Sequence, residues 1–164
     1  MRDHMTRDNK LWAPWRIDYI QRSKEKGCFL CRIIKEKKDL KNFVLMRTQK
    51  TISLLNIYPY NNGHIMVVPK KHVKSLEQLQ PRQIEEVFLH VKKTVASLKK
   101  AFKPSGFNIG INLGKTAGAG LEGHLHVHIV PRWDGDTNFM PVISNTKVLC
   151  QSLQHTYQAL KKYL

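Results

Sequence analysis

Three histidines alternate with aliphatic residues in the segment His124-Leu125-His126-Val127-His128. Successive side chains of a β-strand point to opposite faces, so this spacing predicts three imidazoles on one face and aliphatic side chains on the other. A histidine near neutral pH can be a nucleophile, a proton carrier, a hydrogen-bond donor to phosphate or a metal ligand. The alternative is a polar strand face on which the histidines share no role. The regular alternation favours a functional cluster on rigid backbone.

A glycine-rich segment, Gly114-Lys115-Thr116-Ala117-Gly118-Ala119-Gly120, precedes the histidines. Small residues let backbone N–H groups approach a phosphate closely. The segment lacks the spacing of a lysine-containing P-loop, and a glycine-rich hairpin loop would look similar. Its closeness to the histidine cluster favours phosphate binding.

Two of the three cysteines form the pair Cys28-Phe29-Leu30-Cys31, and the third is Cys150. Three cysteines at this spacing do not make a disulfide framework. A C-x-x-C pair can bind zinc together with two further ligands, can act as a redox pair, or can be two buried thiols. The pair alone leaves these possibilities open.

The elements that must position these residues are predicted from the hydrophobic pattern. Apolar and β-branched runs predict five strands, over residues 43–47, 51–55, 64–68, 107–113 and 124–130. Apolar residues at helical spacing between Pro81 and Pro104 predict one long helix, and leucines after residue 147 predict a closing helix. Consecutive strands with short links predict an α+β fold: an antiparallel β-sheet with one long helix and a C-terminal helix.

The chain of 164 residues has room for one compact domain. We expect a flexible N-terminus over 1–10 and a single domain over 11–164, with its core at about 28–132 and a C-terminal extension over 133–164. The aromatic-rich segment 11–20 should pack on the domain or on a partner subunit. No apolar run approaches the roughly 20 residues that cross a bilayer, and the start lacks the features of a secretory signal. A cytoplasmic protein without a membrane partner is expected.

The chain is strongly basic, with 28 lysines and arginines against 12 acidic residues and a formal net charge of +16. Such a charge favours anionic partners, such as nucleotides, nucleic acid or acidic lipid. The lysines are scattered in pairs, so a distribution over the solvated surface explains the charge at least as well as a nucleic-acid patch. Any binding of nucleic acid is therefore expected to be non-specific.

These segments together resemble the histidine triad (HIT) superfamily. The resemblance rests on the histidine cluster, the Gly118-Ala119-Gly120 loop and the strand entry from Asn56 to Gly63-His64, and it covers about residues 28–132. Three segments, 11–16, 54–61 and 131–141, most closely resemble a bacterial and archaeal branch of this superfamily. That branch is related to fragile histidine triad hydrolases and includes diadenosine tetraphosphate phosphorylases. The resemblance implies an antiparallel sheet with helices and a homodimer.

The resemblance also implies roles for individual residues. His126, the middle histidine, would be the nucleophile, His128 would contact the phosphate and assist the leaving group, and His64 would close the phosphate site. Asn56 would contact the ribose hydroxyls, and Asn112 would lie near the phosphates. The implied nucleotide-binding set also includes the N–H donors of the loop: Gly118, Ala119 and Gly120.

In histidine-triad proteins that carry a C-x-x-C pair, two histidines complete a metal site. The corresponding residues are His72 and His124, which join Cys28 and Cys31. Such a closed four-ligand set is usual for structural zinc and leaves no position for water. A structural Zn²⁺ ion is therefore expected.

The resemblance implies an enzyme that acts on a nucleotide or dinucleotide. We expect a nucleotidyl hydrolase or transferase that cleaves the α-phosphate bond of a dinucleoside polyphosphate, such as diadenosine tri- or tetraphosphate, through a covalent nucleotidyl-histidine. Hydrolysis is favoured. The alternatives are a diadenosine tetraphosphate phosphorylase, a nucleoside phosphoramidase, or a non-catalytic nucleotide-sensing or nucleic-acid-associated module.

Overall fold

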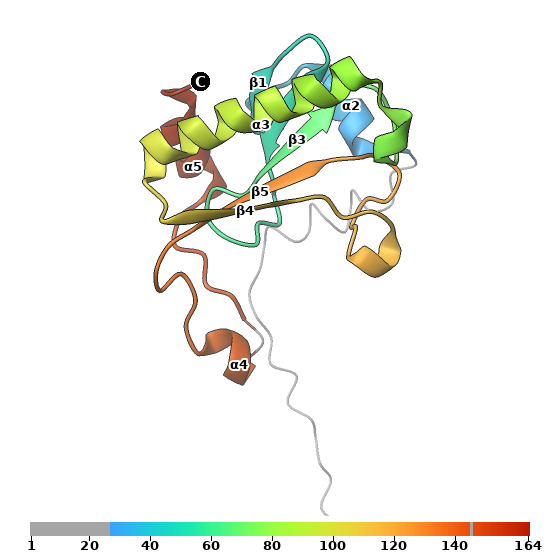
Figure 1. The fold of residues 1–164 in the computed structure, drawn as a ribbon. Helices are drawn as coiled ribbons and strands as arrows, with labels where there is room; N and C mark the ends of the chain where they lie inside the picture. Colours follow the sequence, from blue (N-terminus) through green and yellow to red (C-terminus); the bar gives the residue numbers. More distant parts are fainter. Residues whose placement is uncertain (1–26, 145) are drawn as a thin grey trace, which may run out of the picture.

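A computed structural model describes residues 27–144 and 146–164, which form one antiparallel sheet with helices on both faces (Figure 1). The sheet order is β1-β2-β3-β5-β4, and all neighbouring strands are antiparallel. This arrangement confirms the expected α+β fold. The segments predicted over 1–10 and 11–20 lie outside the described residues. The strands are β1 (Val44–Arg47), β2 (Thr51–Leu55), β3 (Ile65–Pro69), β4 (Gly106–Gly110) and β5 (Val127–Arg132).

Helices cover both faces of the sheet. The long helix α3 runs along one face, and α5 lies beside it (Figure 1). The short helix α2 packs on the opposite face, and α4 extends from the loop after β5. The helices are α2 (Phe29–Glu36), α3 (Pro81–Phe102), α4 (Met140–Ser144) and α5 (Leu153–Lys161), with 3-10 turns η1 (Leu76–Gln78) and η2 (Lys115–Ala117).

Alternation along the strands gives the sheet two apolar faces. On one face, Leu55, Val67 and Ile129 belong to the buried cluster that also contains residues of α3 and α5. On the other face, Leu54 and Met66 pack in a second cluster with residues of α2. The central strands are therefore buried on both sides, which makes the sheet a rigid support for the residues at its end.

Helix α3 begins and ends where the sequence predicts. Pro81 is the first helical residue, where no helical hydrogen bond needs its missing N–H. The side chains of Gln80 and Gln83 cap each other's backbone N–H groups. At the other end, Lys103 adopts a left-handed conformation with φ 46°, directly before Pro104.

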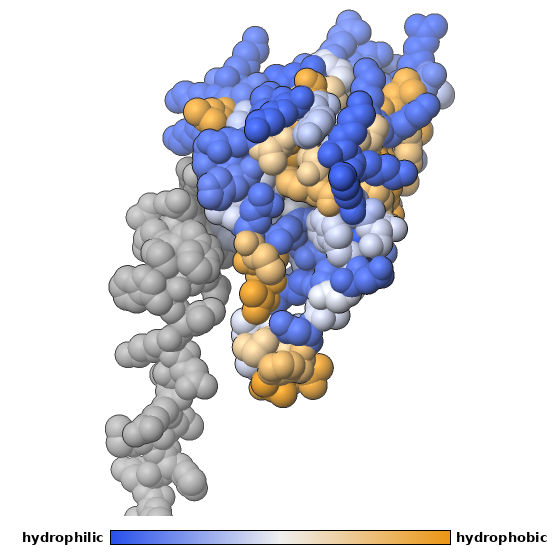
Figure 2. Space-filling view, turned by 90° about the vertical axis from the view of Figure 1, so that its left-hand side faces the viewer, coloured by the Kyte–Doolittle hydropathy of each residue, from blue (hydrophilic) through white to orange (hydrophobic). Residues whose placement is uncertain are grey.

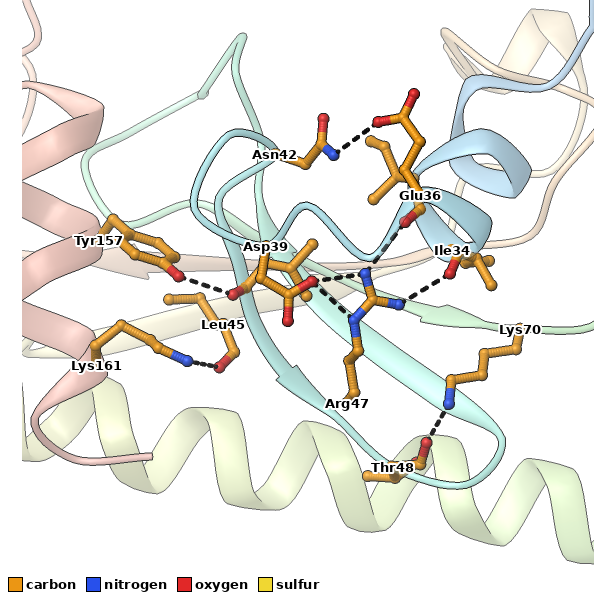
Figure 3. Close-up of polar contacts among 12 residues, drawn as sticks. Ile34, Glu36, Asp39, Asn42, Leu45, Arg47, Thr48, Lys70, Tyr157 and Lys161 are labelled. Carbon is orange, nitrogen blue, oxygen red and sulfur yellow. Dashed lines mark hydrogen bonds and ion pairs between the residues drawn. The ribbon is translucent and has the colours of Figure 1, made fainter.

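Helix α2 is not predicted by the sequence, although it carries the C-x-x-C pair. Cys28 precedes its first turn, and Arg47 of β1 holds the other end (Figure 3). The Arg47 guanidinium donates to Asp39 Oδ1 at 2.7 and 2.9 Å and to the carbonyls of Ile33 and Ile34, each at 3.1 Å. Contacts from the following strand β1 therefore fix the end of this short helix.

Helix α5 confirms the predicted closing helix. Its first turn is capped by Ser152, whose side chain accepts the N–H of His155 at 3.2 Å. Two side chains then tie the helix to β1: the Tyr157 hydroxyl donates to the Val44 carbonyl, and Lys161 donates to the Leu45 carbonyl (Figure 3). The C-terminal helix is thus part of the same core.

Strand β5 is shorter at its start than predicted. It begins at Val127, so His124 and His126 lie in the segment before it. The reason is that the Leu125 N–H donates to the carbonyl of Val73, at 2.6 Å, instead of to a neighbouring strand. The histidine cluster is therefore held at a strand entry.

The other end of this strand pair also differs from the prediction. Strand β4 stops at Gly110 rather than at residue 113, because its pairing with β5 ends there. Pro131 does not end β5, which continues to Arg132. A proline fits this position because a strand residue can lack an N–H where no ladder bond requires it.

The short helix α4 is not predicted by the sequence. It lies away from the sheet, at the lower end of the described chain in Figures 1 and 2. Its apolar side chains are open to solvent, with 87 % exposure for Val142 and 69 % for Ile143. Among the helices of the described residues, none is long and apolar enough to span a membrane.

A buried polar contact joins α3 to β2. His90 is 1 % exposed, and its Nδ1 lies 2.6 Å from the Thr51 hydroxyl. Its Nε2 has no hydrogen-bond partner among the described residues. Burial, together with the charge of Lys93, lowers the pKa of His90 to about 4, and Glu86 opposes this shift. The imidazole is therefore neutral at pH 7.

This histidine should make stability depend on pH. The pKa of an unfolded histidine is about 6.5, so the unfolded chain binds more protons than the folded chain between pH 6.5 and 4. The contribution of His90 is complete above pH 6.5 and declines as the pH falls towards 4, by at most about 3 kcal/mol. Urea unfolding at pH 7.5 and 4.5 should show a smaller acid loss in His90→Gln than in the wild type. Equal losses in both proteins would contradict this assignment.

Candidate active site

The three alternating histidines share one face, as predicted. His124, His126 and His128 are 1 %, 6 % and 8 % exposed, while Val127 and Ile129 lie in the core beneath α3. The ring centroids of His126 and His128 are 4.7 Å apart. The cluster is therefore held by core packing although the regular strand begins only at Val127.

The hydrogen bond of His126 determines which ring nitrogen is free. Its Nδ1 lies 2.7 Å from the backbone carbonyl of His124. A carbonyl only accepts, so Nδ1 carries the proton and Nε2 of the neutral ring keeps its lone pair. An imidazole oriented in this way can attack an electrophilic phosphorus through Nε2.

A second chain of hydrogen bonds orients His128. The backbone N–H of Tyr60 donates to His64 Nδ1 at 3.1 Å, which leaves the proton of His64 on Nε2. That Nε2 lies 2.9 Å from His128 Nδ1, so it donates to it, and the neutral His128 ring carries its own proton on Nε2. His64 and His126 therefore lie on either side of a histidine that can donate a proton.

Burial keeps these two histidines uncharged. Desolvation, followed by repulsion from His128 and His126, lowers the pKa of His64 to about 3. Desolvation and repulsion from His126 lower the pKa of His128 to about 4. At neutral pH both rings are therefore neutral donors, which gives the directions of the hydrogen bonds described above.

Tyr60 covers the histidines and was not singled out by the sequence. Its ring centroid lies 4.6 Å from that of His64 and 5.7 Å from that of His128. Its own ring is 54 % exposed, so it forms the border between the buried histidines and solvent. The turn residues around Pro59 indicate a loop here, but nothing in their pattern indicates which ring faces the site.

Asn56 lies at the end of β2, close to His64. Its Nδ2 is 3.4 Å from His64 Nδ1, and its Oδ1 accepts the N–H of Tyr58 at 2.9 Å. Its backbone N–H donates to the His64 carbonyl at 2.9 Å. The structure therefore places Asn56 beside the histidines, while its contact with ribose stays a prediction.

The glycine-rich loop is solvent-exposed and contains the turn η2. Gly118 has a φ of 81°, a left-handed conformation that favours glycine. Asn112 Nδ2 donates to the Gly118 carbonyl at 3.4 Å, which ties the loop to the segment after β4. Within the described residues, no hydrogen bond joins Gly118, Ala119 or Gly120 to the histidines. Their contact with phosphate stays a prediction.

The four predicted metal ligands come together. The ligand atoms of Cys28, Cys31, His72 and His124 all lie within 4.8 Å of one another. The Sγ atom of Cys31 is 3.2 Å from His72 Nδ1 and 3.5 Å from His124 Nδ1, and Cys28 Sγ is 3.3 Å from His124 Nδ1. Bond lengths of about 2.0–2.3 Å in a tetrahedral zinc site require ligand atoms about 3.3–3.8 Å apart. The set therefore fits zinc.

The second nitrogen of His124 supports this fit. Its Nε2 lies 2.9 Å from the Pro69 carbonyl and therefore carries the proton, so Nδ1 presents its lone pair to the two thiols. Metal-bound histidines usually have such a partner, which fixes the ring. The backbone carbonyl of the same His124 accepts the hydrogen bond from His126 Nδ1–H. The metal cluster and the free imidazole nitrogen are thus linked through one residue.

A charged clamp next to the site was not anticipated. Asp136 accepts two hydrogen bonds from Arg132, at 2.6 and 2.9 Å, and a third from Asn61 at 2.7 Å. Asn61 also donates to the Pro131 carbonyl. The Arg132 guanidinium holds the pKa of Asp136 well below its usual range. This clamp joins the loop before β3 to the end of β5.

Comparisons with known proteins agree on one family. A family model described as "HIT domain" matches residues 37–135. A protein named AP-4-A phosphorylase from Mycobacterium tuberculosis strain H37Rv is 38% identical over 159 residues, which cover 92% of this chain and 82% of the relative. A protein from Schizosaccharomyces pombe named asymmetrical bis(5'-nucleosyl)-tetraphosphatase is 37% identical over 93 residues, 57% of this chain and 50% of that protein.

A solved structure shows the same fold. The crystal structure of a hypothetical histidine triad nucleotide-binding protein from Sulfolobus tokodaii, ST2152, superimposes with a TM-score of 0.66. It is 29% identical in sequence, and the match covers 83% of this chain and 88% of that protein.

Proposed function

Because the chain belongs to the HIT domain family, we propose that it transfers the nucleotidyl group of a dinucleoside polyphosphate to a small acceptor, with His126 as nucleophile. The observation that carries this proposal is the hydrogen bond from His126 Nδ1–H to the His124 carbonyl, because it leaves Nε2 free. A buried, oriented imidazole with a second neutral imidazole beside it suits phosphoryl chemistry, which depends mainly on positioning and charge stabilisation.

The proposed reaction has two displacements at the α-phosphorus. In the first, the lone pair of His126 Nε2 forms a bond to phosphorus, and the bond from phosphorus to the bridging oxygen breaks. His128 Nε2–H donates a hydrogen bond to the leaving oxygen, while His64 holds His128 in this orientation. In the second, an acceptor oxygen attacks the same phosphorus and displaces His126. Asn56 is proposed to hold the ribose, and Asn112 with the N–H groups of Gly118, Ala119 and Gly120 to hold the phosphates.

The acceptor of the nucleotidyl group determines which products form. The sequence analysis favours water, whereas the relative that matches 92% of the chain is named a phosphorylase. We propose inorganic phosphate. Diadenosine tetraphosphate and phosphate would give ATP in the first displacement and ADP in the second, whereas water would give ATP and AMP.

One incubation distinguishes these reactions. Diadenosine tetraphosphate is mixed with the enzyme, with and without phosphate, and the nucleotides are separated by chromatography. ADP that forms only with phosphate supports the proposal. AMP in both mixtures supports a hydrolase, and an intact dinucleotide in both contradicts either activity.

The cluster of Cys28, Cys31, His72 and His124 is proposed to hold one structural Zn²⁺ ion, which supplies rigidity and no reacting group. The described cysteines are all free thiols, as zinc binding requires. We place the protein in the cytoplasm on the same ground, since that compartment keeps thiols reduced.

We also propose that the protein is a homodimer. Strand β4 lies at an edge of the sheet, and an unpaired edge is a template for another strand. This strand also exposes an apolar side chain, Ile109, at 47 %. Pairing of two β4 strands would cover the edge. Contact with nucleic acid, which the net charge favours, stays a non-specific secondary proposal.

The oligomeric state is tested by the mass in solution. Light scattering during size-exclusion chromatography should give twice the chain mass for the wild type and about half that value for Ile109→Glu. Val142→Glu is the matched control, because Val142 is more exposed but lies on α4. A monomeric wild type, or a variant of Ile109 that remains dimeric, would contradict this interface.

A further inference from the structure

A cavity lies beyond Tyr60. It has a volume of about 320 Å³, and its lining includes Tyr60, Asn61, Asn108, Arg132, Thr137 and Lys147. Tyr60 belongs to both places, since its ring packs against His64 and His128 and also lines this space, which we call the distal cavity. The distal cavity is therefore contiguous with the candidate active site.

The sheet determines where the distal cavity lies relative to the histidines. On β5, alternation places His128, Val130 and Arg132 on one face, and two residues advance a strand by about 7 Å. Val130 lines the distal cavity and pairs with Asn108 of the edge strand β4. His128, Val130 and Arg132 thus form a row on one face of β5, and the last two of them line the distal cavity. This row runs away from His126.

The distal cavity is positively charged. Arg132 and Lys147 contribute two cations, and no carboxylate is part of the described lining. The adjacent Asp136 carboxylate is occupied by Arg132, by Asn61 and by the N–H of Trp133 at 3.1 Å. Lys147 donates to the backbone carbonyl of Asp136, at 2.9 Å, and its charge also helps Arg132 to lower the pKa of the Asp136 carboxyl. Two cations against one carboxylate leave an excess positive charge.

The direction of the reaction adds a geometric requirement. In an in-line displacement the leaving oxygen departs on the side of phosphorus opposite the nucleophile. If His126 is the nucleophile and His128 assists the leaving oxygen, as proposed above, the leaving group lies on the His128 side of phosphorus. Phosphates that follow the bridging oxygen would therefore extend towards Arg132 and Lys147, which present amine and guanidinium donors suited to phosphate oxygens.

We propose that the distal cavity binds the phosphates beyond the α-phosphorus, that is, the oligophosphate part of the leaving group. This inference rests on the proposed function for its placement in the reaction, but the binding itself does not require turnover. The selectivity that follows is for substrates with several phosphates over nucleotides that carry only the α-phosphate and a small leaving group.

Two variants test this subsite. Lys147→Gln removes one cation, and Asn108→Asp adds a carboxylate while it keeps the oxygen that accepts from Arg132 at 2.8 Å. The ratio of kcat/KM for diadenosine tetraphosphate to that for adenosine 5'-phosphoramidate should fall about tenfold in each variant. Lys100→Gln, which removes an exposed lysine of α3 on the other side of the sheet, should leave this ratio unchanged. Circular dichroism and thermal melting establish that the variants are folded.

Binding of inorganic tripolyphosphate, measured by calorimetry, separates this inference from the proposed function. We expect tripolyphosphate to bind the wild type and to bind both variants about tenfold more weakly. If the wild type turns over neither nucleotide but shows this binding pattern, the proposed function fails and the subsite stands. Equal losses for both nucleotides, an unchanged ratio, or tripolyphosphate affinity that neither variant weakens would overturn the subsite.

Discussion

Replacing His126 with asparagine should lower the turnover of diadenosine tetraphosphate by about a thousandfold to a millionfold while nucleotide affinity changes little. The hydrogen bonds described above occupy the lone pairs of His64 and His128, and the lone pair of His124 is directed to the metal cluster. Among these described histidines, His126 Nε2 is therefore the ring nitrogen with a free lone pair. Neither His128 nor His124 can replace it, because each is oriented for another contact. Affinity depends on other groups, so KM or the dissociation constant for AMP should change far less than kcat.

The comparison with His128 makes this prediction specific. His128→Asn should reduce kcat less than His126→Asn, because it removes a hydrogen bond to the leaving group but keeps the nucleophile. With a substrate whose leaving group has a low pKa, the loss of kcat in His128→Asn should become smaller. The same substrate should not restore the kcat of His126→Asn. If the two variants lost the same activity with every leaving group, separate roles for these histidines would be contradicted.

Removal of the metal cluster should have the second large effect, on both stability and turnover. The protein should contain one zinc ion per chain by elemental analysis, and Cys28→Ser combined with Cys31→Ser should abolish this content. Loss of a structural zinc removes folding free energy, so the thermal midpoint should fall by at least about 10 °C. The effect should extend to kcat, because His124 presents Nδ1 to the thiols and its carbonyl to His126.

Cys150 provides the matched control for these thiols. It is exposed and lies outside the cluster, so Cys150→Ser should keep zinc, melting temperature and kcat at their wild-type values. Protein purified without chelator that contains far less than one zinc per chain would contradict the metal site. A zinc-free double variant with unchanged kcat would contradict the link from the cluster to His126.

The parts of the fold that the sequence predicts are those with strong local signals. Helix α3 is marked at both ends by Pro81 and Pro104 and has a long helical pattern, and the strands carry β-branched runs. Helix α2 has only eight residues, too few for a long helical pattern, and Arg47 of the following strand stabilises its end. The start of β5 depends on a hydrogen bond to Val73, which no alternation of residue types can show.

The candidate site divides in the same way. The alternation of His124, His126 and His128 is visible in the sequence, but His72 enters the metal set only through the resemblance to other HIT proteins. Tyr60 and Asp136 lie on loops, and each has one contact with a residue far away in the chain: Tyr60 with His128, and Asp136 with Asn61. Contacts of this kind follow from tertiary packing, so the sequence gives the residues but not their roles.

The stereochemical course at the α-phosphorus tests the covalent mechanism most directly. A dinucleotide with an α-phosphorothioate of defined configuration is cleaved in the presence of phosphate, and phosphorus NMR gives the configuration of the nucleoside thiodiphosphate that forms. Two in-line displacements, one by His126 and one by the acceptor, each invert the phosphorus. The account predicts net retention of configuration. Net inversion would mean a single direct displacement and would contradict a nucleotidyl group held on His126.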